Sequence, residues 1–194
     1  MSRSLEEIGQ EAWKSKVEKV NLEVFAFTYG SLVVQLIKDY EDYEQVNNKL
    51  EKMGYNIGIR LIDDFLARTS STSNNVNRCE TFEEAMEVMA KVAFQMFLNI
   101  QPKVAISGAN SDECLLELET NPLNEFVELP PAVAEGGLWY SNVLCGVIRG
   151  ALEMIQMEVK AEFVSDVLRS SDNTTLIRIK LIKILDEEVP IEED

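Results

Sequence analysis

The chain has 194 residues, with 34 acidic and 18 basic side chains, no histidine and a formal net charge of −16. This length supports one domain whose core needs no disulfide or metal, and the missing histidine excludes catalytic triads and histidine-dependent general bases. Residues 112–128 and 186–194 each hold six acids and no bases. Because nucleic-acid binding depends on lysine and arginine at phosphates, no binding to DNA or RNA is expected.

The three cysteines, Cys79, Cys114 and Cys145, form no C-x-x-C pair. Without histidine, an ordinary zinc site is not expected either. The amino terminus has no hydrophobic signal region, and no other segment is predicted to span a membrane. These features favour a cytosolic protein with reduced thiols.

Three helices are predicted before a polar loop. Residues 1–20 have apolar side chains at helical spacing, which fits either a peripheral helix or a frayed tail. Residues 22–40 repeat apolar side chains at intervals of three and four, with Asn21 as the N-cap. Residues 44–68 form the third helix, and the Ser-, Thr- and Asn-rich segment 69–77 forms the loop.

The segment 138–157 is apolar over most of a helical circumference, so we expect a central buried helix there. Gly146 and Gly150 lie one turn apart in it, as do Gly54 and Gly58 in the third predicted helix. Because glycine lacks a Cβ atom, such pairs permit close approach of another backbone. We therefore expect both segments to cross neighbouring helices closely.

A capping box of Thr81 and Glu84 opens a further helix, which ends before Pro102. Strands are predicted where apolar residues alternate or where short apolar runs flank a turn: 103–107, 114–119, 159–163 and 177–181. The order of elements predicts an α+β fold, with helices packed around a central hydrophobic helix and a small antiparallel sheet. We divide the chain into an N-terminal extension (1–20), one domain (21–185) and an acidic tail (186–194).

Several polar residues have ordinary structural interpretations. Asp63 and Asp64 point about 100° apart on a helix, which favours a solvated face over a catalytic carboxylate pair. Arg149 and Glu153, one turn apart, are interpreted as an ion pair within one helix. Cys145 lies on an apolar face and is expected in the core.

Cys79 follows the polar loop, precedes a helix start and has Arg78 as its neighbour. A positive charge and a helix N-terminus both favour the thiolate form. From these residues alone, the preferred interpretation of Cys79 is a free cysteine without a functional role, and a reactive thiol is the alternative. Lys14, Lys16 and Lys19 with Arg78 are either a basic patch facing a bilayer or four solvated cations.

Several long motifs together resemble the Bet-three subunits of the TRAPP (transport protein particle) vesicle-tethering complex. They are TYGSLVVQLIKDY (28–40), MGYNIGIRLIDDFLAR (53–68), Arg78-Cys79, NPLNEFVELP (121–130), WYSNVLCGVIRGALEMIQM (139–157) and ILDEEVPI (184–191). The resemblance implies the TRAPP small-subunit fold and an adaptor without an active site of its own. It also implies peripheral association with cis-Golgi and endoplasmic reticulum membranes in transport between the two organelles.

The resemblance further implies partners and a lipid. Such subunits pair through their helices with related small TRAPP subunits and self-associate, and we predict Leu36 at this interface. Within the complex they contribute to nucleotide exchange on a Rab-family GTPase. The family's palmitoyl thioester falls on Cys79, inside an apolar tunnel that Ala93 lines, and we assign Met89 and Phe97 to the same lining. The expected GTPase contacts are tail residues Glu188, Val189, Pro190, Ile191 and Glu192. A module that binds fatty acids reversibly in such a tunnel is the alternative.

Overall fold

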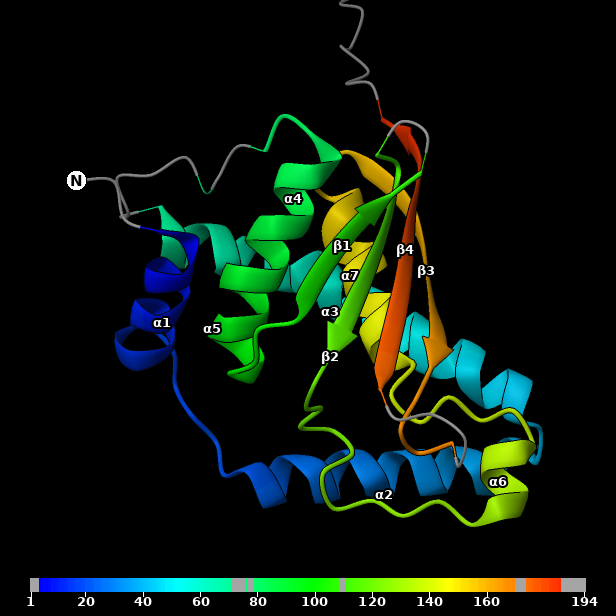
Figure 1. The fold of residues 1–194 in the computed structure, drawn as a ribbon. Coiled ribbons are helices and arrows are strands. Elements are labelled where there is room, and N and C mark those ends of the chain that lie inside the picture. The colour runs from blue at the N-terminus through cyan, green and yellow to red at the C-terminus, as the bar shows by residue number, and fades with distance from the viewer. Residues whose placement is uncertain (1–3, 71–75, 77–78, 109–110, 170–173, 186–194) are drawn as a thin grey trace, which may run out of the picture.

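The structure is a computed structural model that describes residues 4–70, 76, 79–108, 111–169 and 174–185. Its elements follow one another along the chain as helices, a hairpin, two helices and a second hairpin (Figure 1). In chain order they are α1 (Leu5–Ser15), α2 (Leu22–Tyr40), α3 (Tyr43–Thr69), α4 (Phe82–Val88), the π-turn η1 (Met89–Ala93), α5 (Phe94–Leu98), β1 (Lys103–Ser107), β2 (Glu113–Leu118), α6 (Pro131–Glu135), α7 (Val143–Glu153), β3 (Met157–Ser165) and β4 (Thr175–Ile184).

Local sequence signals set the helix starts. The Asn21 side chain accepts a hydrogen bond from the Val24 N–H at 3.2 Å, as predicted for the N-cap of α2. The Thr81 hydroxyl likewise accepts from the Glu84 N–H at 3.2 Å. The Glu84 carboxylate, however, accepts from the N–H of Glu80 rather than from that of Thr81. Both caps satisfy backbone donors that have no partner within the helix.

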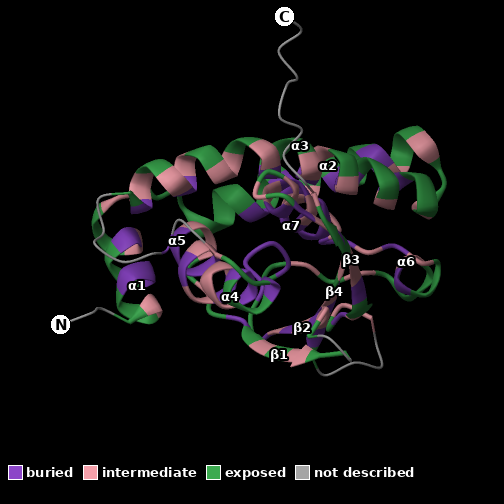
Figure 2. Cartoon of the chain, turned by 90° about the horizontal axis from the view of Figure 1, so that it is seen from above, coloured by how far each residue is buried: buried purple, intermediate pink, exposed green. Residues whose placement is uncertain are grey.

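The four strands form one antiparallel sheet in the order β1-β2-β4-β3. The two predicted hairpins are joined because β2 pairs with β4, with Leu116 opposite Ile177. One face of the sheet packs against α7, which lies between the sheet and α3 (Figures 1 and 2). The predicted α+β fold around a central apolar helix is confirmed.

The central helix is shorter than the predicted segment 138–157. Helix α7 spans Val143–Glu153 only, while Leu138 is buried in the non-helical segment before it. Gln156 has a positive φ of 67°, which ends the helical path, and Met157 already begins β3. A buried loop and a buried helix end are equally apolar, so apolar content alone overestimates the length of a core helix.

Helices α3 and α7 approach so closely that their backbones are in contact. A Cβ atom added at Gly54, Gly58, Gly146 or Gly150 would lie 2.0–2.3 Å from a backbone carbonyl oxygen of the opposite helix. No side chain fits in such a space. The close crossing predicted from the two glycine pairs is confirmed, and the pairs face each other.

The predicted ion pair between Arg149 and Glu153 is wrong. Arg149 Nε lies 3.0 Å from Glu51 Oε1 on α3, and its guanidinium stacks 4.5 Å from the centre of the Tyr55 ring. Glu153 accepts a hydrogen bond from the Tyr55 hydroxyl at 2.9 Å. The closeness of α3 and α7 offers each charge a partner across the crossing, and these contacts replace the pair within one helix.

The two N-terminal helices lie on different parts of the domain. Of the two expectations for the N-terminal extension, the peripheral helix is found, because α1 packs on η1 and α5 and buries Ile8 and Ala12. Leu36 of α2, predicted at an interface, is 7% exposed and belongs to the chain's own core. The exposed apolar face of α2 consists of other residues, among them Val24, Phe27, Leu32 and Val34.

We expect Gly146→Ala to lower the free energy of unfolding by about 1–3 kcal/mol, because its methyl group would overlap the Glu51 carbonyl. Urea denaturation measures the change. Gly30→Ala in α2 is the control, since the nearest atom to an added Cβ there is the end of the Tyr140 side chain at 3.1 Å. Equal stability of Gly146→Ala and the unmodified chain would contradict the backbone contact.

Candidate functional site

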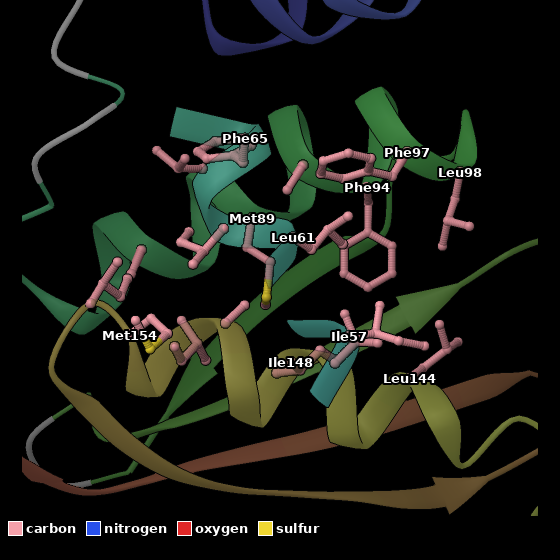
Figure 3. A pocket seen from close by; sticks show the side chains of 18 of the residues that line it. Ile57, Leu61, Phe65, Met89, Phe94, Phe97, Leu98, Leu144, Ile148 and Met154 are labelled. Carbon is pink, nitrogen blue, oxygen red and sulfur yellow. The ribbon is translucent and has the colours of Figure 1, made fainter. Parts of the chain in front are cut away.

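An apolar cavity of about 620 Å³ lies between α3, the α4–η1–α5 segment and α7. Its wall is built from aliphatic, aromatic and methionine side chains that point inward from these helices, and Figure 3 shows them. Helix α2 adds Phe25 and Tyr29 to the lining. The volume lies within the roughly 300–1,000 Å³ of typical ligand sites.

The cavity is elongated along α7. Met154, just beyond the end of α7, lies at one end, and Leu98 and Leu144 lie at the other, with Met89 and Ile148 between them (Figure 3). The α4–η1–α5 segment forms the opposite wall, together with the C-terminal half of α3. An extended hydrocarbon chain has the shape and the polarity that such a space accommodates.

Cys79 lines this cavity, three residues before the start of α4, and is half-buried. Burial raises the pKa of the Cys79 thiol, and the nearby Glu84 carboxylate raises it further. The sequence-based expectation of a setting that favours the thiolate is therefore wrong. Arg78, on which that expectation partly rested, lies outside the described residues.

The structure brings Cys79 together with all three predicted lining residues. Met89 and Ala93 face the cavity from the π-turn η1, and Phe97 faces it from α5. Helix α3 also lines the cavity, with Ile57, Leu61 and Phe65, which was not predicted. The apolar stripe of this helix was visible in the sequence, but nothing local tells a core-facing stripe from a cavity-facing one.

The other two cysteines are core residues, as expected for Cys145. Cys114 in β2 and Cys145 in α7 are 0% and 1% exposed, and burial raises the pKa of both thiols, that of Cys114 to about 12. Neither lines the cavity. Cys79 is therefore the one cavity-lining nucleophilic thiol among the described residues.

The remaining candidates are polar surface groups. Asp64 pairs with Arg68 at 2.7 Å, while Asp63 is exposed. In the suggested basic patch, Lys16 donates to the Arg68 carbonyl at 2.7 Å, and Lys19 lies over the Trp13 ring. The five tail residues predicted to contact a GTPase lie outside the described residues.

The described residues contain no group of three or more Cys, Asp or Glu side chains arranged to hold a metal ion. None of the described helices has the length and hydropathy needed to cross a bilayer.

Comparison with known proteins gives consistent matches. Residues 25–180 match the model of the family described as transport protein particle (TRAPP) component. The trafficking protein particle complex subunit BET3 of Saccharomyces cerevisiae is 52% identical over 194 residues, which is 100% of this chain and 97% of the relative. The subunit bet3 of Schizosaccharomyces pombe is 54% identical over 98% of both chains.

A solved structure adds a ligand to the comparison. It is that of trafficking protein particle complex subunit 3 from Naegleria fowleri covalently bound to palmitic acid. It is 45% identical to this chain, with a TM-score of 0.81, and the match covers 88% of this chain and 100% of that one. From its residues, its fold and these relatives, the chain belongs to the TRAPP component family, with the BET3 or subunit 3 proteins as its close relatives.

Proposed function

We propose that this chain is an adaptor subunit of a TRAPP vesicle-tethering complex that carries a palmitoyl group on Cys79 as part of its hydrophobic core. The observation that carries the lipid assignment is the 620 Å³ apolar cavity beside Cys79. Palmitic acid bound covalently to the Naegleria relative supports it. The complex acts in transport between endoplasmic reticulum and Golgi, at the surface of their membranes, and promotes nucleotide exchange on a Rab-family GTPase.

The acyl transfer needs only the thiol and an acyl thioester. The Cys79 sulfur attacks the thioester carbonyl carbon, the bond from that carbon to the donor sulfur breaks, and the donor thiolate takes up the proton that Cys79 lost. Because burial raises the pKa of Cys79, the reaction speeds up as pH rises toward that pKa. The chain then enters the cavity, where each buried methylene contributes roughly 0.8 kcal/mol.

A buried acyl chain serves the fold rather than the membrane. Its burial contributes at most about 10 kcal/mol before entropy and strain, which is comparable with the entire stability of a typical domain, about 5–15 kcal/mol. A chain inside the protein is unavailable to a bilayer, and one acyl chain anchors only marginally in any case. The lipid is therefore assigned to the core.

We expect Cys79→Ser to abolish the acyl adduct and to lower the melting temperature. Ala93→Leu should block acylation with Cys79 still present, because the larger side chain fills the cavity. Intact mass of protein from a eukaryotic host measures the adduct, and calorimetry measures the melting temperature. Ala67→Leu at an exposed position of α3 is the control.

Two outcomes would contradict this assignment in different ways. An unmodified chain without any adduct would refute the lipid role of Cys79. Lipid that is extracted intact and exchanges freely, without a thioester, would support the alternative of a reversible fatty-acid-binding module.

The exposed apolar face of α2 supports pairing with another helical subunit. Val24, Phe27 and Val34 are 62%, 61% and 50% exposed and recur at helical spacing along one side. Apolar surface gathered in this way favours an interface. The chain alone therefore forms a homodimer, which exchanges into a heterodimer with a related small TRAPP subunit.

We expect Val34→Asp to convert the dimer into a monomer, because a charge at the interface loses its hydration without gaining a partner. Sedimentation at micromolar concentration measures the state. Ile182→Asp, which places the same charge at a 52% exposed position of β4, should leave the dimer intact. A monodisperse monomer of the unmodified chain would rule out self-association.

For the acidic tail we propose contact with the GTPase, since its carboxylates suit a basic or magnesium-bearing nucleotide site. Deleting 188–194 should leave complex assembly intact and slow nucleotide exchange by the assembled complex. Release of a fluorescent guanine nucleotide from the GTPase measures the rate. Unchanged exchange would leave the tail with a role in solubility only.

A further inference from the structure

The wall of the acyl cavity contains a π-turn. In η1 the Phe94 N–H bonds to the Met89 carbonyl, five residues earlier, instead of four as in an α-helix. One residue is therefore inserted between α4 and α5. Such turns are rare and recur at functional sites.

The inserted residue decides which side chains face the cavity. In an uninterrupted α-helix of 100° per residue, Val92 and Met96 would point within about 20° of Ala85, which lines the cavity. Ala93 and Phe97 would point about 80° and 120° away from it. The structure has the reverse arrangement, because Ala93 and Phe97 line the cavity. Val92 and Met96 do not line the cavity; they are 0% exposed, in a second hydrophobic cluster that also contains Phe65 and Val76 from the cavity wall.

Helix α1 covers the outer side of this π-turn. Ile8 and Ala12 belong to the cluster that buries Val92 and Met96. Between them, the buried Gly9 lies against the π-turn itself.

The contact at Gly9 is a close one. A Cβ atom at this position would be 2.3 Å from the Lys91 carbonyl oxygen, in the middle of the π-turn, and 3.1 Å from Gln95 Cβ. Any side chain here would push α1 off the turn. The position thus requires glycine for close approach of α1.

We infer that α1 holds the π-turn in place and so keeps the acyl cavity open, with Gly9 as the positioning residue. Without α1, Val92 and Met96 would lose their contacts with Ile8 and Ala12 and become more exposed to water. A regular α-helix would bury them again by turning them into the cavity, where they would take the place of the acyl chain. Docking of α1 and occupation of the cavity by an acyl chain both favour the conformation that contains the π-turn. Each therefore makes the other more favourable. This inference rests on the proposed acylation of Cys79.

The test compares two valine variants of the full chain, stripped of lipid with hydroxylamine. Gly9→Val disturbs the contact with the π-turn, and Gln10→Val places the same residue at the next, exposed position of α1. Acylation of Cys79 by palmitoyl coenzyme A, followed by mass spectrometry, reports on the cavity. Alkylation of Cys79 by iodoacetamide, which needs no cavity, reports on the thiol alone.

Gly9→Val should slow acylation roughly tenfold or more, with alkylation unchanged, and Gln10→Val should match the unmodified chain. Deleting Lys91 in the Gly9→Val chain removes the inserted residue, so that a regular helix presents Ala93 and Phe97 to the cavity. Acylation should then recover.

Several results would overturn the inference and leave the proposed function intact. They are acylation of Gly9→Val at the unmodified rate, an equal loss of reactivity toward both reagents, and no recovery in a Lys91-deleted chain that still melts cooperatively. Absence of acylation in the unmodified chain would refute the proposed function, and this inference with it.

Discussion

The backbone contact between α3 and α7 is the constraint on which the rest of the structure depends. Four glycines remove every side chain from the crossing, so each helix meets carbonyl groups of the other at van der Waals distance. The side chains on either side of the crossing must then find separate partners. On one side α7 packs against the sheet, and on the other α3, α7 and the α4–η1–α5 segment diverge around the cavity.

The same closeness explains the polar contacts of α7. Arg149 and Glu153 both point toward α3, where Glu51 and Tyr55 lie within hydrogen-bonding distance. These groups are partly exposed, so their ion pair adds little to the free energy of folding. Their contribution is to fix the orientation of each helix about its own axis. Rotation of either helix would separate Arg149 from Glu51 and Glu153 from Tyr55.

The cavity is best understood as a core that the chain leaves incomplete. Interiors of proteins are close-packed, and an empty apolar space loses the contacts of every atom that lines it. Under the proposed acylation of Cys79, which lines this space, the acyl chain would complete the packing. The π-turn and α1 then acquire a shared role, because they determine which side chains fill that space and which stay outside it.

The sequence by itself determined the elements that depend on near neighbours, which are the caps at Asn21 and Thr81 and the two glycine pairs. The lining residue Ala93 came from the family resemblance, and the π-turn is what makes it face the cavity. The tertiary structure alone decided the contacts between distant segments. The pairing of β2 with β4 and the partners of Arg149 depend on atoms far away in the chain. The burial that raises the pKa of Cys79 likewise follows from the packing of the fold. Local sequence patterns indicate hydrogen bonds and spacing within a few residues. The burial of a side chain and the charged groups around it depend on which distant segments the fold places next to it.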